Sequence, residues 1–157
     1  MTPHQALPPY DWPALLSLIR RAFAGMQGRI DPPSSMHALT SEMIAEQATT
    51  GEIWIIGSPA VACLFLTPKP GSLYLHKLAV DPAHQGQGHA RSLIGTAATR
   101  ARALGLPALT LSTRVELLEN HAVFRALGFF ESGRSAHPGF TRPTTLLFTL
   151  PLVGESR

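Results

Sequence analysis

LYLHKLAVDPAHQGQGHARSLI, residues 73–94, is the stretch that decides the fold of this chain. It begins with the apolar pattern of a strand, turns at Asp81-Pro82, and continues after Gly88 with apolar residues at helical spacing. A strand, a glycine-rich turn and a helix start in this order form an anion-binding site. The first N–H groups of the helix lack partners there, and the helix dipole is positive. We therefore expect a phosphate group to bind at this turn.

The turn does not match the two best-known phosphate motifs. No Gly-Lys-Ser/Thr follows it, so it is not a P-loop. The G-x-G formed by Gly86 and Gly88 lacks the third glycine and the downstream acid of a dinucleotide fingerprint. A lone G-x-G turn is usually structural, so the residues around it have to identify the ligand.

Together with its flanks, the turn resembles motif A of the GNAT superfamily, the acetyl-CoA-dependent N-acetyltransferases. Gln85, Gly88 and Ala90 match the family pattern Gln/Arg-x-x-Gly-x-Gly/Ala, and LAVDP at 78–82 looks like the family's strand-to-turn sequence. A second stretch, NHAVFRALGFFESG at 120–133, is similar in character to the family's Asn-x-x-Ala-x-x-x-Tyr-x-x-x-Gly-Phe segment. The resemblance extends over roughly residues 11–150 and suggests a bacterial member that acts on a small amine or a peptide.

The resemblance also implies the fold. We expect an α/β protein with the GNAT fold, in which a mixed, mostly antiparallel sheet of about six to seven strands is flanked by helices. The sheet is expected to splay at the acetyl-CoA site. The predicted helices cover residues 11–25, 40–49, 89–104 and 120–127, and the predicted strands cover 52–56, 60–67, 73–80, 108–113, a segment from 128, and 144–150, with a short strand within 1–10 and a loose tail after 152.

Length and composition agree with one globular domain over residues 1–157, with its core at about 11–150. Hydrophobic residues make up 45% and charged residues 15%, which excludes disorder. The net charge of +3 comes without clustered Lys and Arg, so nucleic acid is not an expected partner. Arg91, Arg100 and Arg102 lie off the apolar face of their helix and are interpreted as facing solvent.

No signal peptide or membrane span is expected. The longest apolar stretch, 53–66, is broken by Gly57 and Pro59 and falls short of the ~20 residues that a span needs. Cys63 is the only cysteine and lies in this apolar run, so we expect a small core residue. The chain is predicted to be cytoplasmic, and a homodimer is left open.

The resemblance assigns a donor-binding role to two segments. The pyrophosphate of acetyl-CoA would lie on the amides of residues 85–90, and the pantetheine arm would run along the strand that ends with Leu78, Ala79 and Val80. The N–H of Leu78 or Val80 would face the thioester oxygen. The seven histidines show no zinc spacing, so no metal is expected. The residues expected to bind the cofactor are Leu78, Ala79, Val80, Gln85, Gly86, Gln87, Gly88, His89, Ala90, Arg91, Asn120 and Phe124.

Two of these assignments have alternatives. Asn120 matches the family Asn that contacts the CoA arm, but a helix N-cap would also explain it. Phe124 stands where the family often has a tyrosine that protonates the departing thiolate. Water or Tyr74 could replace that tyrosine, or its loss could mark a weak enzyme or an acyl-CoA sensor.

Proton handling points to Tyr74 and His76. Residues i and i+2 of a strand share a face, so Tyr74, His76 and Leu78 are expected to point the same way. His76 occupies a position similar to one of two histidines in serotonin N-acetyltransferases, where Tyr74 takes the place of the other. His76 is therefore either a general base near neutral pH or a packed strand residue with a structural hydrogen bond.

The acceptor is not named by the sequence. Arg114 and Glu116 either line the cleft or form a solvated pair, and His137 with the loop at 140–142 could form a cleft wall. The expected function is transfer of acetyl from acetyl-CoA to a primary amine by direct attack in a ternary complex. The alternatives are a non-catalytic acyl-CoA-binding regulator with the GNAT fold and a general nucleotide-binding α/β domain.

Overall fold

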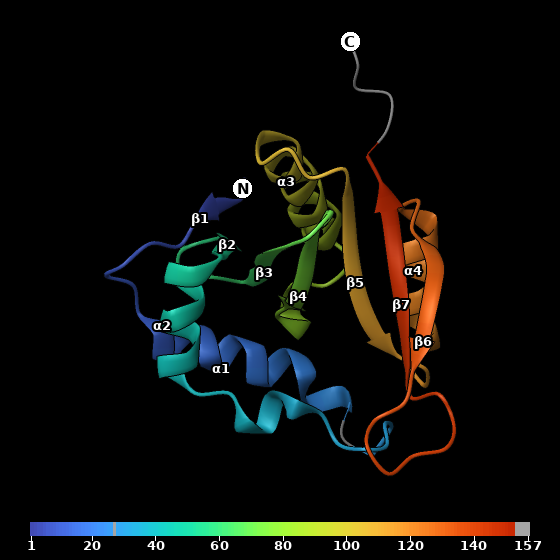
Figure 1. The fold of residues 1–157 in the computed structure, drawn as a ribbon. Helices are drawn as coiled ribbons and strands as arrows, with labels where there is room; N and C mark the ends of the chain where they lie inside the picture. Colours follow the sequence, from blue (N-terminus) through green and yellow to red (C-terminus); the bar gives the residue numbers. More distant parts are fainter. Residues whose placement is uncertain (27, 153–157) are drawn as a thin grey trace.

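One seven-stranded sheet organises the chain, with the strand order β1-β2-β3-β4-β5-β7-β6 (Figure 1). The computed structural model describes residues 1–26 and 28–152. Every neighbouring pair is antiparallel except β4 and β5, which are parallel. The strands are β1 (His4–Gln5), β2 (Glu52–Ile56), β3 (Ala62–Lys69), β4 (Ser72–Val80), β5 (Ala108–Arg114), β6 (Phe130–Ser135) and β7 (Thr145–Pro151). The α-helices are α1 (Trp12–Phe23), α2 (Ser41–Thr50), α3 (His89–Ala103) and α4 (Leu118–Ala126).

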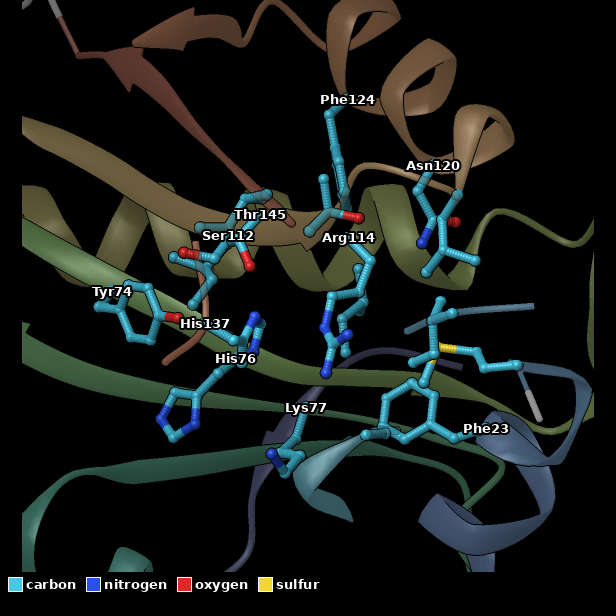
Figure 2. A pocket seen from close by; sticks show the side chains of 18 residues that line it. Phe23, Tyr74, His76, Lys77, Ser112, Arg114, Asn120, Phe124, His137 and Thr145 are labelled. Carbon is cyan, nitrogen blue, oxygen red and sulfur yellow. The ribbon is translucent and has the colours of Figure 1, made fainter. Parts of the chain in front are cut away.

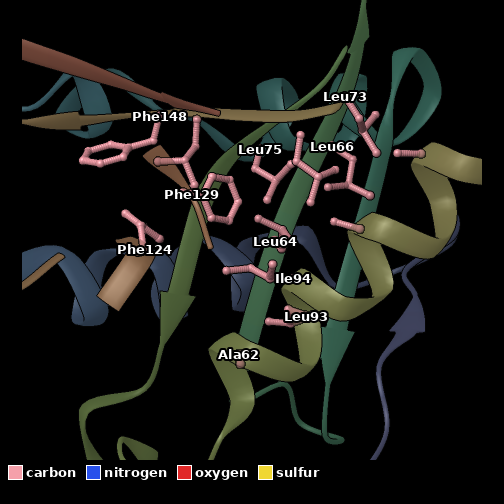
Figure 3. Close-up of a cluster of buried hydrophobic side chains, with 14 of the residues drawn as sticks. Ala62, Leu64, Leu66, Leu73, Leu75, Leu93, Ile94, Phe124, Phe129 and Phe148 are labelled. Atoms are coloured by element: carbon pink, nitrogen blue, oxygen red, sulfur yellow. The ribbon is translucent and has the colours of Figure 1, made fainter. Parts of the chain in front are cut away.

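The helices cover both faces of this sheet and divide the core in two. One buried cluster packs α3 and α4 against the sheet through residues such as Leu93, Phe124 and Phe148 (Figure 3). The other cluster packs α1 and α2 against the opposite face through residues such as Ile19 and Ile44. The expected mixed α/β fold is thus confirmed, and the predicted tail after 152 falls outside the described residues.

Local signals fix where the helices begin. The side chain of Asp11 accepts a hydrogen bond from the Ala14 amide at 3.1 Å, and that of Thr40 accepts one from the Met43 amide at 3.2 Å. Both side chains therefore act as N-caps. Helix α3 instead has Gly88 at its N-cap position, with a left-handed φ of 84° and no side-chain hydrogen bond to cap the helix. Its first amides are left available for a ligand.

The sheet opens between its two parallel strands. Strands β4 and β5 are paired only from Leu73 with Leu109 to Leu75 with Leu111. Beyond these residues β4 continues to Val80 and β5 to Arg114 with no pairing between them. In Figure 1 the two strands diverge toward the end that faces α1. The expected splay is present, and it exposes backbone groups of β4 that a ligand can use.

A bulge at Lys77 changes which side chains share a face of β4. Lys77 has φ 53°, and the one residue of β3 between positions 63 and 65 faces the two residues of β4 between positions 76 and 79. Leu78 consequently packs with the α3 side of the core, whereas Ala79 packs with the α1 side. The expectation that Leu78 points the same way as Tyr74 and His76 was wrong, because the extra residue reverses the alternation.

Two other expectations need correction. Helix α4 begins at Leu118 with Leu117 at the N-cap position, so Asn120 lies within the first turn and is not the cap. Arg100 does not simply face solvent. Its Nε and Nη2 donate to the two carboxylate oxygens of Glu52 at 2.9 and 2.6 Å. This bidentate pair joins α3 to β2, and Trp54 Nε1 donates to the same carboxylate at 2.8 Å.

We expect Glu52→Gln to lower the free energy of unfolding by about 1–3 kcal/mol at pH 7, because it removes a charge-assisted bidentate pair. The hydrogen bond from Arg100 lowers the pKa of Glu52. A lowered pKa stabilises the fold at pH values above the unfolded pKa of about 4.5, and this contribution is lost as the pH falls through the folded pKa. The difference between wild type and variant should therefore shrink in acid.

Urea denaturation at neutral and acidic pH measures both effects. Glu42→Gln, an exposed change on α2, is the matched control and should alter stability far less. An equal loss in both variants would contradict the structural role of Glu52.

Within residues 1–26 and 28–152, each helix is too short or too polar to cross a membrane.

Candidate active site

A cavity of about 630 Å³ lies where β4 turns into α3. We call it the donor cavity. Its walls come from the end of β4, the turn, the first residues of α3, the segment around Phe23 and Met26, and α4. The expected cofactor residues that line it are Leu78, Ala79, Val80, Gln85, Gly86, Gly88, His89, Ala90, Arg91, Asn120 and Phe124. Gln87 does not line it, because its side chain turns to the ring of His89 at 3.2 Å.

The turn suits a phosphate. Gly86 and Gly88 have φ values of 78° and 84°, and a Cβ at either would meet no atom within 4 Å. The backbone can therefore take this conformation and let an anion approach. His84 Nδ1 is buried with no hydrogen-bond partner among the described residues, and His84 lines the same cavity. These groups fit the pyrophosphate of an acyl-CoA, with no metal needed to neutralise it.

The exposed edge of β4 suits the pantetheine arm. The Asp81 amide donates to the Val61 carbonyl on the β3 side at 2.8 Å. Because successive amides of a strand point to opposite sides, the Val80 amide faces the β5 side, and so does that of Leu78 two residues earlier. The pairing with β5 ends at Leu75, so these amides face the opening.

A second cavity of about 380 Å³ lies between the diverging strands (Figure 2). We call it the acceptor cavity. Its lining includes Tyr74, His76 and Lys77 from β4, Arg114 from β5 and His137 from the segment after β6. It shares with the donor cavity the residues Phe23, Met26, Leu78, Leu117, Asn120 and Phe124. The two cavities therefore meet at the end of the splay, where an acyl group and an acceptor could come together.

His76 is held in a structural network. Its Nε2 lies 2.9 Å from Thr67 Oγ1, its ring stacks on Tyr74 with the centroids 5.3 Å apart, and the edge of Phe65 contacts it. Burial, with smaller contributions from Lys77 and Lys69, lowers the pKa of His76 to about 4. His76 is therefore neutral at physiological pH but a weak base for an amine.

Phe124 lies at the junction of the two cavities but packs as a core residue. It is 8% exposed, and its ring centroid lies 5.9 Å from that of Phe129 and 6.2 Å from that of Phe148 (Figure 3). The ring fills the position where the resemblance places a tyrosine and offers no proton.

Of the remaining residues predicted to line the cleft, some line the acceptor cavity and others do not. Arg114 lines the acceptor cavity and donates to the carbonyl oxygens of Pro32 and Pro33, which ties β5 to the loop before α2. Glu116 does not line it and pairs with Arg142 at 3.7 Å. His137 does line it, and the pairing of its ring with Thr144 orients it.

Lys77 is a cavity residue that sequence reasoning did not identify. It is about half-buried, and burial alone lowers its pKa. No hydrogen bond or ion pair of its ammonium occurs within the described part of the chain. A strand pattern gives no sign of a bulge with positive φ, so the only available signal was that Lys77 is one of two lysines in the sequence.

Among residues 1–26 and 28–152, no group of three or more His, Cys, Asp or Glu side chains is placed to hold a metal ion. Cys63 is fully buried in the α1-side core, away from both cavities, and burial raises its pKa to about 12. A thiol in that setting is unsuited to attack a thioester.

Comparison with known proteins agrees with this geometry. Residues 12–129 match the model of the acetyltransferase (GNAT) family. No curated protein matches the sequence. Among solved structures, the chain is similar to the ribosomal-protein-S18-alanine N-acetyltransferase of Escherichia coli, with 21% identity, 99% of each chain covered and a TM-score of 0.72.

Two further structures resemble it and carry ligands. A GNAT family acetyltransferase from Elizabethkingia anophelis with acetyl-CoA bound has 18% identity, a TM-score of 0.69, and coverage of 96% of this chain and 97% of that one. The PaiA N-acetyltransferase of Thermoplasma acidophilum in complex with coenzyme A has 12% identity, a TM-score of 0.75, and coverage of 96% and 99%. At these identities the likeness concerns the fold.

Proposed function

This chain belongs to the GNAT acetyltransferase family, whose members are acyltransferases that use acetyl-CoA, and on that premise we propose that it acetylates a primary amine by direct attack in a ternary complex. The observation that carries the proposal is the meeting of the two cavities at Leu78, Asn120 and Phe124. An acyl donor on the open edge of β4 and an amine between the diverging strands would have their reacting atoms together. That arrangement supplies proximity and orientation.

Groups of the chain itself would bind the acyl donor and stabilise the charge that develops during transfer. The amides at the start of α3 bind the pyrophosphate, and the amides of Leu78 and Val80 bind the arm and stabilise charge on the thioester oxygen. Asn120, whose side chain lines both cavities, orients the arm. The buried Cys63 offers no route through an acyl-enzyme.

A screen of candidate acceptor amines tests the proposal. Acetyl-CoA is offered with amino acids, polyamines, aminoglycosides and peptides, and thiol release is checked against acetylated product by mass spectrometry. Initial rates over both substrates should give intersecting lines. Parallel lines would indicate a covalent acyl-enzyme, and tight CoA binding with no amine raising thiol release above hydrolysis would indicate the regulator.

We expect the acceptor amine to react from its own neutral fraction, with His76 as a positioning residue. Because His76 has a pKa of about 4, it stays neutral across the assay range, so kcat/KM should rise with pH with no inflection between about pH 6 and 7. His76→Gln should lower kcat/KM about tenfold through misplacement of Tyr74, with the acetyl-CoA Kd and the shape of the profile retained. A wild-type inflection near 6.5 that disappears in His76→Gln would establish a general base instead.

A further inference from the structure

The acceptor cavity has donors and positive charge but lacks acids. Lys77, Arg114, His76 and His137 contribute to its lining, and among the described residues the lining contains no Asp or Glu. A cavity built to hold a polyamine or another multiply charged cation would be expected to place carboxylates near it. This one would repel such a ligand and favour an anion.

The cation on the β4 wall has no acceptor. Lys77 makes no ion pair within the described chain, and burial lowers its pKa because no carboxylate offsets its desolvation. Buried polar groups without partners are costly, so a ligand that brings acceptor oxygens would relieve that cost.

The other cation is already partly engaged. Arg114 donates to two backbone carbonyls of the loop before α2 and extends from β5 across the opening in Figure 2. Lys77 projects from the β4 bulge on the opposite wall. The one lysine of β4 therefore lies at the bulge and lines the acceptor cavity.

From this arrangement we propose that the acceptor is an amine that carries a carboxylate, such as an amino acid or a peptide with a free C-terminus, and that Lys77 binds this carboxylate. The inference rests on the proposed function and adds the substrate class. Positive charge near the bound amine also favours its neutral form, so a carboxylate acceptor and a cationic wall are compatible with attack that lacks a side-chain base.

The test uses amines that differ in one carboxylate. β-Alanine, γ-aminobutyrate and alanyl-alanine are each compared with the corresponding amide as acceptors of acetyl from acetyl-CoA. At least one acid should be preferred over its amide by about tenfold to a hundredfold in kcat/KM, as expected for a charge-assisted bond. Equal use of acids and amides would overturn the proposal while the transfer of acetyl to amines stands.

Variants of Lys77 show whether this residue causes the preference for acids over amides. Lys77→Met should abolish it with the acetyl-CoA Kd unchanged, and Lys77→Arg should restore part of it, since all three side chains meet the same backbone constraint at φ 53°. Lys69→Met is the matched control, because it removes the other lysine, which lies over the Tyr74 ring outside the cavity, and should keep the preference. A preference that survives Lys77→Met would contradict the assignment.

A carboxylate could also arrive on the donor. Succinyl-CoA is therefore compared with acetyl-CoA in the presence of an uncharged amine. A Lys77-dependent preference for succinyl-CoA would move the carboxylate to the acyl group and overturn the acceptor proposal. If no amine of any class is acetylated although acetyl-CoA binds, the proposed function fails, and the inference fails with it.

Discussion

Gly88→Glu should weaken acetyl-CoA binding at least about a hundredfold. Gly88 is the N-cap of α3 with φ 84° and lies at the donor cavity, where a Cβ has open space. A glutamate there places a carboxylate beside the pyrophosphate and offsets the positive end of the helix dipole. It also strains a backbone conformation that side chains rarely adopt. Calorimetry with acetyl-CoA and with CoA measures the loss.

A control variant distinguishes the effect on the phosphate site from the effect of backbone strain. Gly105 follows the C-cap of the same helix with φ 72°, has no atom within 4 Å of an added Cβ, and does not line either cavity. Gly105→Glu makes the same change in charge and in backbone strain, so it should leave the Kd near the wild-type value. Micromolar affinity retained in Gly88→Glu, or equal losses in both variants, would contradict the phosphate assignment.

The donor half of the site could be predicted from the sequence because it depends on a local pattern of residues. A strand, Asp81-Pro82 and two glycines before an apolar helix determine the turn by their order alone, and the expected residues line one cavity with the exception of Gln87. Glycine at positive φ is readable, since few other residues adopt it.

The acceptor half depends on long-range geometry and was largely unreadable. The bulge at Lys77 reverses the alternation of side chains between the two faces of β4 after His76. A lysine in a strand pattern gives no indication that its φ is positive. The tie from Arg114 to Pro32 and Pro33 spans about half of the chain, so local pattern could not predict it. The pair of Arg100 with Glu52 was missed for the same reason, because an arginine off the apolar face of a helix usually faces water.

Phe124→Tyr should raise kcat about tenfold or more. The Phe124 ring lines both cavities where they meet, so a hydroxyl added there would stand near the departing thiolate. A general acid contributes about 10²–10⁴-fold when well placed, and the aromatic packing against Phe129 and Phe148 argues for a gain below that range. Because a thiol has a pKa of about 8.5, the gain should be larger at pH 7 than at pH 9, where the thiolate leaves without a proton.

Phe129→Tyr is the matched control for this change. Phe129 belongs to the same aromatic cluster and is 3% exposed, but it lines neither cavity, so its hydroxyl should cost stability with no gain in rate. Thiol release across pH for both variants decides the matter. A folded Phe124→Tyr protein with wild-type kcat at pH 7 would mean that breakdown of the thioester is not limited by the leaving thiol. Activity that appears only in Phe124→Tyr would mean that the wild-type chain binds acetyl-CoA as a regulator, because a single hydroxyl would then separate it from catalysis.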